Sequence, residues 1–235
     1  MFGPVKNVIF DLDGTLIDSM PGAVAGLKGI LKKVLGAPVS DEEFTKALGK
    51  SPREIFACFL EEASLDEAVE DWNHLNLNTT SDQVPMFKGV SELVSFLVES
   101  NAHNLALYTG RDRKGAERFI SLHEPLRRGL SPDLIRCGDD GFKPKPSGEA
   151  VKDILSKFAW SPEDTIFVGD HHHDCGSARE AGVKFGAALW DEFLSQGNTS
   201  RAKFKGNWER WDAHNVDLRF NTPITFLNWL KNDQG

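Results

Sequence analysis

Two aspartates separated by one residue, Asp11 and Asp13, follow a short apolar run and precede a glycine. Residues two apart in a strand point to the same side, so these carboxylates would repel each other unless something offset their charge. A divalent cation between them would remove that cost, and a carboxylate fixed beside a cation can act as a nucleophile. The pair therefore predicts a metal-assisted site directly after a buried strand.

The elements that must position this pair alternate along the chain. Short apolar runs predict five strands, at residues 5–10, 104–109, 134–137, 165–168 and 184–189. Longer segments between them predict four helices, at residues 89–99, 113–122, 147–158 and 174–181. This alternation predicts right-handed βαβ units, and strands without polar alternation are typical of a sheet buried on both sides. The expected fold class is α/β, with a Rossmann-like parallel sheet and helices on both faces.

The region between the first strand and its crossover helix is long enough to form a separate insert. It contains apolar patterns of helical period, and Ser51-Pro52 pairs a capping residue with a proline at the first helical position. We expect a core domain of residues 1–17 and 86–235 and an all-helical cap domain of residues 18–85. The four helices expected in the cap cover residues 23–35, 41–48, 52–60 and 65–77.

The last part of the chain has a weaker pattern. Apolar residues in the segment 190–215 show no helical or strand period, so this segment is predicted to be a long connection. Long connections often have a functional role. Residues 216–220 then alternate like an edge strand, and Thr222-Pro223 predicts the start of a final helix.

Composition narrows the class of protein. The chain has 235 residues and a formal net charge of −8, which argues against a general nucleic-acid or anionic-membrane binder. It has no apolar stretch of about 18 residues and no room for a signal peptide before the first strand. Its three scattered cysteines offer no disulfide framework. We therefore expect a cytoplasmic protein, a monomer or homodimer, with a small-molecule partner and neither a nucleic-acid nor a membrane partner.

Polar residues follow the other strands as well. In open parallel sheets, ligands bind outside the carboxyl ends of the strands, so these residues are expected at one edge. Oxygen ligands suit Mg²⁺, and a lysine, a hydroxyl and backbone N–H groups would offset the charge of a phosphate. The segments concerned are Thr109-Gly110-Arg111, Lys143-Pro144-Lys145-Pro146 and Gly169-Asp170 with Asp174.

Taken together, these segments resemble the four motifs of the haloacid dehalogenase-like phosphohydrolase superfamily, and the chain looks phosphoglycolate phosphatase-like with a helical cap. Residues 11–15 match the first motif, Thr109 the second, residues 143–146 the KPxP form of the third, and Gly169-Asp170 with Asp174 the fourth. The resemblance implies a Mg²⁺-dependent phosphatase that hydrolyses a small phosphorylated metabolite. It also implies a cap that closes over the site.

The resemblance implies a role for each matched residue. Asp11 would be the nucleophile that forms an aspartyl-phosphate, and Asp13 would protonate the leaving group and then activate water. Mg²⁺ would be held by Asp11, the backbone carbonyl of Asp13, Asp170 and Asp174. The phosphoryl oxygens would be held by Thr109, Gly110 and Lys143.

Several alternatives remain open at this point. Lys145 also precedes a proline and competes with Lys143, although the KPxP register favours Lys143. Lys50 and Arg53 in the cap are candidates for substrate binding or are ordinary surface charges. The run His171–His173 departs from the family and could add a transition-metal ligand, but adjacent histidines are not expected to face one metal together.

Two further functions are alternatives to the phosphatase. One is a phosphomutase of the β-phosphoglucomutase type, although residues 19–23 lack the histidine that this family carries in its first cap helix. The other is a non-catalytic protein that binds a phosphate ligand, against which the intact acids argue.

Overall fold

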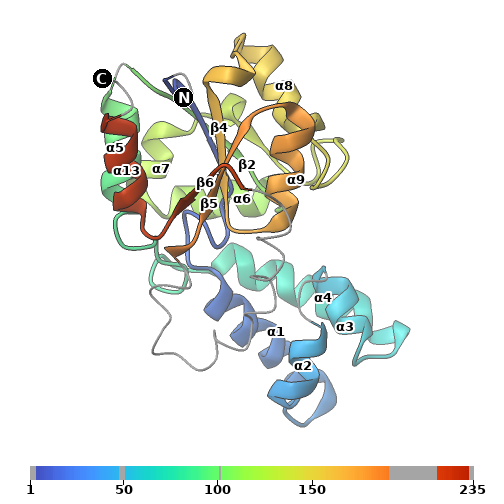
Figure 1. Cartoon of the computed structure of the whole chain (residues 1–235). Helices are drawn as coiled ribbons and strands as arrows, with labels where there is room; N and C mark the ends of the chain where they lie inside the picture. Colours follow the sequence, from blue (N-terminus) through green and yellow to red (C-terminus); the bar gives the residue numbers. More distant parts are fainter. Residues whose placement is uncertain (1–3, 48–50, 101, 191–215, 233–235) are drawn as a thin grey trace. The chain divides into compact units, whose positions relative to one another are not determined.

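The computed structural model describes residues 4–47, 51–100, 102–190 and 216–232, which form two compact units (Figure 1). One unit combines Met1–Asp18 with Pro85–Gly235, and the other is Ser19–Val84. Each unit has its own hydrophobic core. Among the described residues, no helix combines the length and apolar character needed to span a bilayer.

The larger unit is built on a parallel sheet with the order β3-β2-β1-β4-β5-β6 in the described part of the chain. The central strands β1 and β4 are buried at every position, as their unbroken apolar sequence predicts. This confirms the expected parallel α/β sheet. The strands are β1 (Asn7–Phe10), β2 (Asn104–Tyr108), β3 (Ile135–Arg136), β4 (Thr165–Gly169), β5 (Lys184–Ala188) and β6 (Leu218–Phe220).

Helices cover both faces of this sheet. Helices α8 and α9 lie on one side, and α5, α7 and α13 lie on the other (Figure 1). The short α7 was not expected from the sequence, because a six-residue helix that contains a proline and a glycine shows no usable period. The helices are α5 (Val90–Glu99), α6 (Arg113–Ser121), α7 (Glu124–Gly129), α8 (Glu149–Phe158), α9 (His172–Ala181) and α13 (Pro223–Asn232).

The core on the α8 and α9 face is centred on an aromatic cluster. Phe167 of β4 contacts Phe185 of β5 edge to face at 6.4 Å between ring centroids, and Tyr108 of β2 lies 6.1 Å away on its other side. Ile154 of α8 is completely buried in the same cluster. This packing fixes the spacing of β2, β4 and β5, and hence the positions at which the three strands end.

The smaller unit is all-helical in its described residues and packs around Leu31, Phe44, Phe56 and Trp72. Ser51 forms the predicted cap: its hydroxyl accepts from the Glu54 N–H while the Glu54 carboxylate accepts from the Ser51 N–H. The helices are α1 (Met20–Leu35), α2 (Asp41–Ala47), α3 (Pro52–Ala57) and α4 (Glu62–Asn78).

The C-terminal prediction is confirmed where the structure describes it. Strand β6 lies at the edge of the sheet beside β5, and α13 begins at Pro223. The long connection expected at 190–215 falls almost entirely on residues outside the described part. Its first residue, Trp190, is completely buried.

Candidate active site at the carboxyl edge of the sheet

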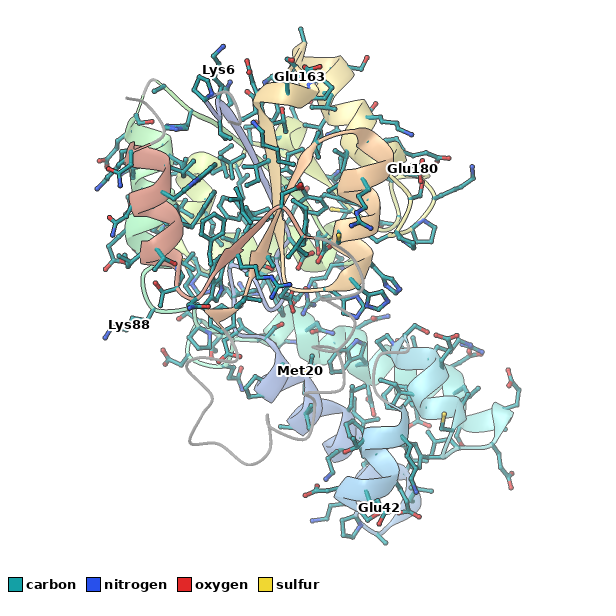
Figure 2. All side chains as sticks on the ribbon, in the orientation of Figure 1. Lys6, Met20, Glu42, Lys88, Glu163 and Glu180 are labelled. Atoms are coloured by element: carbon teal, nitrogen blue, oxygen red, sulfur yellow. The ribbon has the colours of Figure 1, made fainter. Side chains whose placement is uncertain are left out.

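The ends of β1, β2 and β4 bring the predicted polar residues to one edge of the sheet. Phe10 is opposite Leu107 of β2 and Val168 of β4, so the residues that follow these strands leave the sheet together. Lys6 and Glu163 lie at the other edge, beside the amino ends of the strands (Figure 2). The carboxyl edge is where open α/β sheets bind ligands.

Three carboxylates meet at this edge. Asp11, Asp170 and Asp174 each offer an oxygen, and these atoms lie within 4.8 Å of one another. Asp11 and Asp174 are buried, with only 7% and 2% of their surface exposed. The Thr15 hydroxyl donates to Asp170 at 3.1 Å. Carboxylates gathered so closely out of water need cations around them, as the sequence predicted.

The cation inside this cluster is Lys145. Its Nζ lies 2.5 Å from Asp11 Oδ1 and 2.7 Å from Asp174 Oδ1, and 11% of its side chain is exposed. Lys143 is 77% exposed, and its Nζ lies 2.7 Å from Glu149 at the start of α8. The predicted place of Lys143 beside Asp11 is therefore wrong. The chain between β3 and α8 turns Lys143 outward to Glu149 and directs Lys145 inward.

Asp11 and the buried Lys145 shift each other's pKa values. Burial raises the pKa of Asp11, and the nearby Lys145 ammonium offsets part of that rise. Burial alone would lower the pKa of Lys145, but the charges of Asp11 and Asp174 outweigh it and raise the pKa overall. The ammonium also lies 4.7 Å from the Tyr108 ring centroid and 5.2 Å from that of Phe167, which stabilises it further. Lys145 therefore remains charged in its buried position.

Asp13 is held by a different cation. Both of its carboxylate oxygens accept from Arg111, from Nε at 2.6 Å and from Nη2 at 2.7 Å. The guanidinium lies over the Phe119 ring, with its central carbon 3.8 Å from the ring centroid. The first expectation, that one cation holds the Asp11 and Asp13 side chains together, therefore needs correction, since each carboxylate faces its own cation. The sequence placed Arg111 after a strand but gave no signal for this pairing.

Thr109 anchors the turn that carries Arg111. It is 1% exposed, its N–H donates to the Arg136 carbonyl, and its hydroxyl accepts from the Arg111 N–H at 3.2 Å. Gly110, the other predicted phosphate contact, lies between the two. The turn thus brings Thr109 and Gly110 to the edge where Asp11 also ends its strand.

The loop after β1 is held close to the acidic cluster. Gly14 has φ +81°, and a Cβ on it would lie 2.3 Å from Asp170 Oδ2. Beyond it, the Trp190 indole N–H donates to the Thr15 carbonyl at 2.8 Å. Only glycine permits both this backbone conformation and this approach to Asp170. No pattern in the sequence indicated that Trp190 would support the loop.

The helix that carries Asp174 begins within the histidine run. The His171 N–H donates to Asp174 Oδ2 at 3.0 Å, and the His173 N–H donates to His171 Nδ1 at 3.3 Å. Burial and the neighbouring His172 lower the pKa of His171 to about 4. One ring nitrogen from each of the three histidines lies within 4.8 Å of the others. The three rings thus lie closer together than adjacent positions in a chain led us to expect, and whether they face one metal stays a prediction.

Of the two cap residues predicted to contact substrate, the structure describes Arg53. Arg53 forms ion pairs with Asp66 at 2.6 Å and Glu62 at 3.3 Å. Lys50 lies outside the described residues. Their role in substrate binding stays a prediction.

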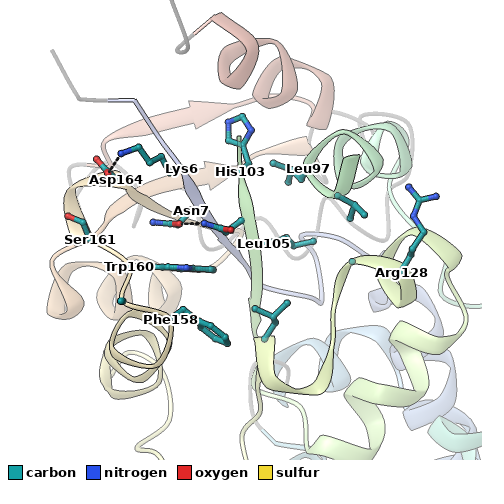
Figure 3. A pocket seen from close by; sticks show the side chains of 15 residues that line it. Lys6, Asn7, Leu97, His103, Leu105, Arg128, Phe158, Trp160, Ser161 and Asp164 are labelled. Atoms are coloured by element: carbon teal, nitrogen blue, oxygen red, sulfur yellow. Dashed lines mark hydrogen bonds and ion pairs between the residues drawn. The ribbon is translucent and has the colours of Figure 1, made fainter. Parts of the chain in front are cut away.

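A hollow of about 740 Å³ lies at the opposite edge of the sheet (Figure 3). Its wall includes Trp160, Lys6, His103 and Arg128, next to the amino ends of β1 and β2. It is far from the carboxylates along the strand direction, so it is not the candidate active site.

Known proteins match this chain over most of its length. A family described as haloacid dehalogenase-like hydrolase matches residues 8–188. The pyrophosphatase PpaX of Bacillus cereus (strain AH820) is 25% identical over 186 residues, which is 79% of this chain and 84% of the relative.

Solved structures match the fold. A haloacid dehalogenase superfamily hydrolase of subfamily IA, variant 1, from Geobacter sulfurreducens PCA is 27% identical, with a TM-score of 0.64 over 79% of this chain and 87% of its own. A structure described as a predicted phosphoglycolate phosphatase from Haemophilus somnus 129PT has a TM-score of 0.74 at 18% identity and covers 95% of this chain and 97% of its own. At that identity the second match supports the fold alone.

Replacing Lys145 with methionine is expected to destabilise the folded protein when no divalent cation is present. The change leaves two buried carboxylates without their ammonium, which costs about 3–5 kcal/mol in the free energy of unfolding. Added Mg²⁺ should return part of that loss, because it replaces the missing positive charge. Urea denaturation with and without Mg²⁺ measures both effects.

The matched control is Lys143→Met, which should leave the urea midpoint unchanged because this side chain is mostly exposed to water. Equal loss of stability in the two variants would show that Lys145 has no special place in the cluster.

Replacing Gly14 with alanine is expected to weaken Mg²⁺ binding by roughly 10- to 100-fold, because the new methyl group displaces Asp170. Isothermal titration calorimetry measures the affinity. The control is Gly182→Ala at the end of α9, where φ is +74° and nothing lies within 4 Å of the added methyl. It should lose about 1–2 kcal/mol of stability through backbone strain and bind Mg²⁺ normally. Unchanged Mg²⁺ affinity in Gly14→Ala would contradict the placement of the cation beside Asp170.

Proposed function

The chain belongs to the haloacid dehalogenase-like hydrolase family, and from this premise we propose that it is a Mg²⁺-dependent phosphatase. Its substrate is a small phosphorylated metabolite, and the reaction passes through an aspartyl-phosphate on Asp11. The observation that carries the proposal is the buried Asp11 carboxylate beside the Lys145 ammonium and two further acids. A nucleophile, a fixed positive charge and a set of cation ligands are what phosphoryl transfer requires.

The donor set fits Mg²⁺. The carboxylates of Asp11, Asp170 and Asp174 supply oxygen ligands, which Mg²⁺ prefers to nitrogen or sulfur. Three carboxylates and one ammonium leave two negative charges unbalanced, and a divalent cation matches that charge. When bound, the cation neutralises charge on the phosphoryl oxygens and helps to orient them. The backbone carbonyl of Asp13 is a further ligand in this proposal.

In the first step, a carboxylate oxygen of Asp11 attacks phosphorus and the bond from phosphorus to the leaving oxygen breaks. Asp13 enters this step protonated and released from Arg111, and gives that proton to the leaving oxygen as the bond breaks. Lys145 and the turn at Thr109 and Gly110 offset charge on the phosphoryl oxygens during the transfer. Lys145 takes the role that the sequence motif suggested for Lys143, because it is the lysine beside Asp11.

In the second step, Asp13 takes a proton from water, and the water oxygen attacks the phosphorus of the aspartyl-phosphate. The bond from phosphorus to Asp11 breaks, which releases inorganic phosphate and restores the carboxylate. Both proton transfers require Asp13 to exchange contacts with Arg111, which binds both of its oxygens. The arrangement supports a division in which Asp11 forms the covalent bond and Asp13 moves protons.

The substrate is expected to be a phosphate ester or a pyrophosphate, since one matched relative is named a pyrophosphatase. A phosphate-release screen should cover both classes, with Mg²⁺, Mn²⁺, Co²⁺ and Ni²⁺ tested in parallel. Conversion of one sugar phosphate isomer to another without phosphate release would favour a phosphomutase instead. Tight binding of one compound with no turnover would favour a non-catalytic binding protein. Lys50 and Arg53 remain candidates for contacting the leaving group of the substrate.

Replacing Asp11 with asparagine should lower kcat by roughly 10⁴-fold or more, because the amide cannot form the aspartyl-phosphate. The side chain keeps its shape, and circular dichroism should show an unchanged fold. Acid-quenched samples of the native protein with ³²P-labelled substrate should retain label on the protein, and the variant should not. Full activity in Asp11→Asn would contradict the mechanism.

Replacing Asp13 with asparagine should affect substrates according to their leaving groups. Loss of acid catalysis should slow release of an alkoxide by roughly 10²- to 10⁴-fold. Release of p-nitrophenolate needs no proton, so p-nitrophenyl phosphate should give a burst of one product per chain before the slow second step. Stopped-flow absorbance measures that burst. Its absence, with equal slowing of both substrates in the first step, would argue against proton transfer by Asp13.

A further inference from the structure

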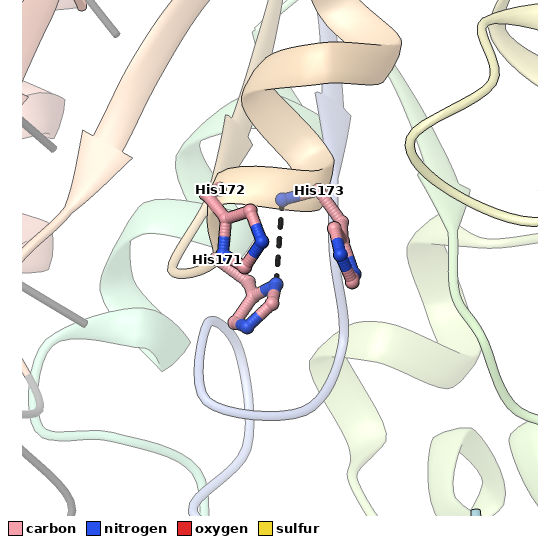
Figure 4. Close-up of side chains that lie close together, drawn as sticks. All are labelled: His171, His172 and His173. Atoms are coloured by element: carbon pink, nitrogen blue, oxygen red, sulfur yellow. Dashed lines mark hydrogen bonds between the residues drawn. The ribbon is translucent and has the colours of Figure 1, made fainter. Parts of the chain in front are cut away.

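The histidine run at the start of α9 gathers three imidazoles into one cluster (Figure 4). The ring centroids lie 4.1 Å apart for His171 and His172, 4.5 Å for His171 and His173, and 4.2 Å for His172 and His173. A continuous helix would turn successive side chains apart by about 100°. His171 lies just before the helix with φ −124° and ψ 148°, so its ring comes back toward the other two. The change of backbone conformation at this residue makes the cluster possible.

The separations suit a metal ion. One ring nitrogen from each histidine lies within 4.8 Å of the others. Nitrogens bound to Zn²⁺ lie about 2.0–2.1 Å from the metal, so in a tetrahedral site they are about 3.3 Å apart. The nitrogens must therefore move closer by up to about 1.5 Å, which the proposal below assigns to rotation of the three rings. His173 is exposed, and His171 and His172 are partly exposed, so an ion from solution can reach them.

We propose that His171, His172 and His173 bind a transition-metal ion of the Zn²⁺ or Ni²⁺ class, at a site separate from the carboxylate cluster. Imidazole nitrogen suits these ions, whereas Mg²⁺ prefers the oxygens of Asp11, Asp170 and Asp174. The histidines therefore favour Zn²⁺ or Ni²⁺ over Mg²⁺, and water can complete the coordination there. This proposal goes beyond the phosphatase function and does not depend on it.

Binding has a structural consequence at His171. Its Nδ1 accepts a hydrogen bond from the His173 N–H, so the lone pair on that nitrogen is already engaged. A neutral imidazole has one such lone pair, and a metal ion can take it only if this hydrogen bond breaks. The ion therefore replaces the side-chain cap of α9 rather than adding to it.

The site is also connected to the acidic cluster through one residue. The His171 N–H donates to Asp174 Oδ2, and Asp174 Oδ1 accepts from Lys145. A shift of His171 on metal binding moves the group that orients Asp174. An ion at the histidines can therefore change the carboxylate cluster without replacing any of its members.

The test is calorimetric titration of the full chain, prepared without a polyhistidine tag, with Ni²⁺ in saturating Mg²⁺. A large excess of Mg²⁺ competes for the carboxylates, so a Ni²⁺ site whose affinity does not fall as Mg²⁺ is raised lies outside them. We expect one Ni²⁺ per chain. Titration with Co²⁺ should give visible absorption bands typical of nitrogen ligands.

Three variants and one control assign the ligands. His171→Asn retains a capping residue at the start of α9, and His172→Gln and His173→Gln remove the other two rings. Each should weaken Ni²⁺ binding by roughly 10-fold or more. The control, His74→Gln, changes an exposed histidine in α4 and should bind Ni²⁺ as the native chain does. Melting temperatures without metal confirm that each variant is folded.

Other outcomes would overturn the proposal. These are no Ni²⁺ binding in the presence of Mg²⁺, simple competition between the two ions for one site, or equal weakening by His74→Gln. If His172→Gln and His173→Gln both bound Ni²⁺ as tightly as the native chain, the proposal would also be overturned, because a single histidine would then account for the binding.

Discussion

The structure of the candidate site depends on one buried ammonium shared by two buried carboxylates. Lys145 lies within hydrogen-bonding distance of Asp11, which follows β1, and of Asp174, which belongs to α9. A buried carboxylate without a positive charge beside it costs several kcal/mol, and the ammonium reduces that cost for both acids. The lysine therefore ties the central strand, the loop before α8 and the start of α9 into one electrostatic unit. Because it neutralises only one of the two charges, the unit retains its attraction for a cation.

The sheet makes this arrangement possible by ending its strands together. The register of β1 with β2 and β4 brings Asp11, Thr109 and Asp170 to the same edge, and the aromatic packing of Phe167 maintains the spacing. Gly14 then allows the loop to lie against Asp170. The position of each polar group is thus set by buried apolar contacts several residues away, which are rigid because the interior is closely packed.

The parallel sheet and most of its helices could be predicted from sequence, because unbroken apolar runs and a 3.6-residue period depend only on local spacing. The lysine could not. Lys143 and Lys145 have the same chemistry, both precede proline, and only the path of the loop turns one toward Glu149 and the other toward Asp11. Arg111 gave no signal either, since its partner is 98 residues away in the chain. Sequence spacing thus predicted which residue types gather at the edge but not which charges pair.

The different partners of Asp11 and Asp13 give two nearby acids different chemical properties. Asp11 is buried and faces an ammonium that also serves Asp174, so its charge is directed into the cluster where a phosphoryl group and a cation would lie. Asp13 has 31% of its side chain exposed and faces a guanidinium supported by Phe119. A carboxylate at the rim is accessible to a leaving group and to water, which is what proton transfer to and from them requires. In the proposed mechanism, the different roles of the two acids follow from their burial and charge partners, and not from their order in the sequence.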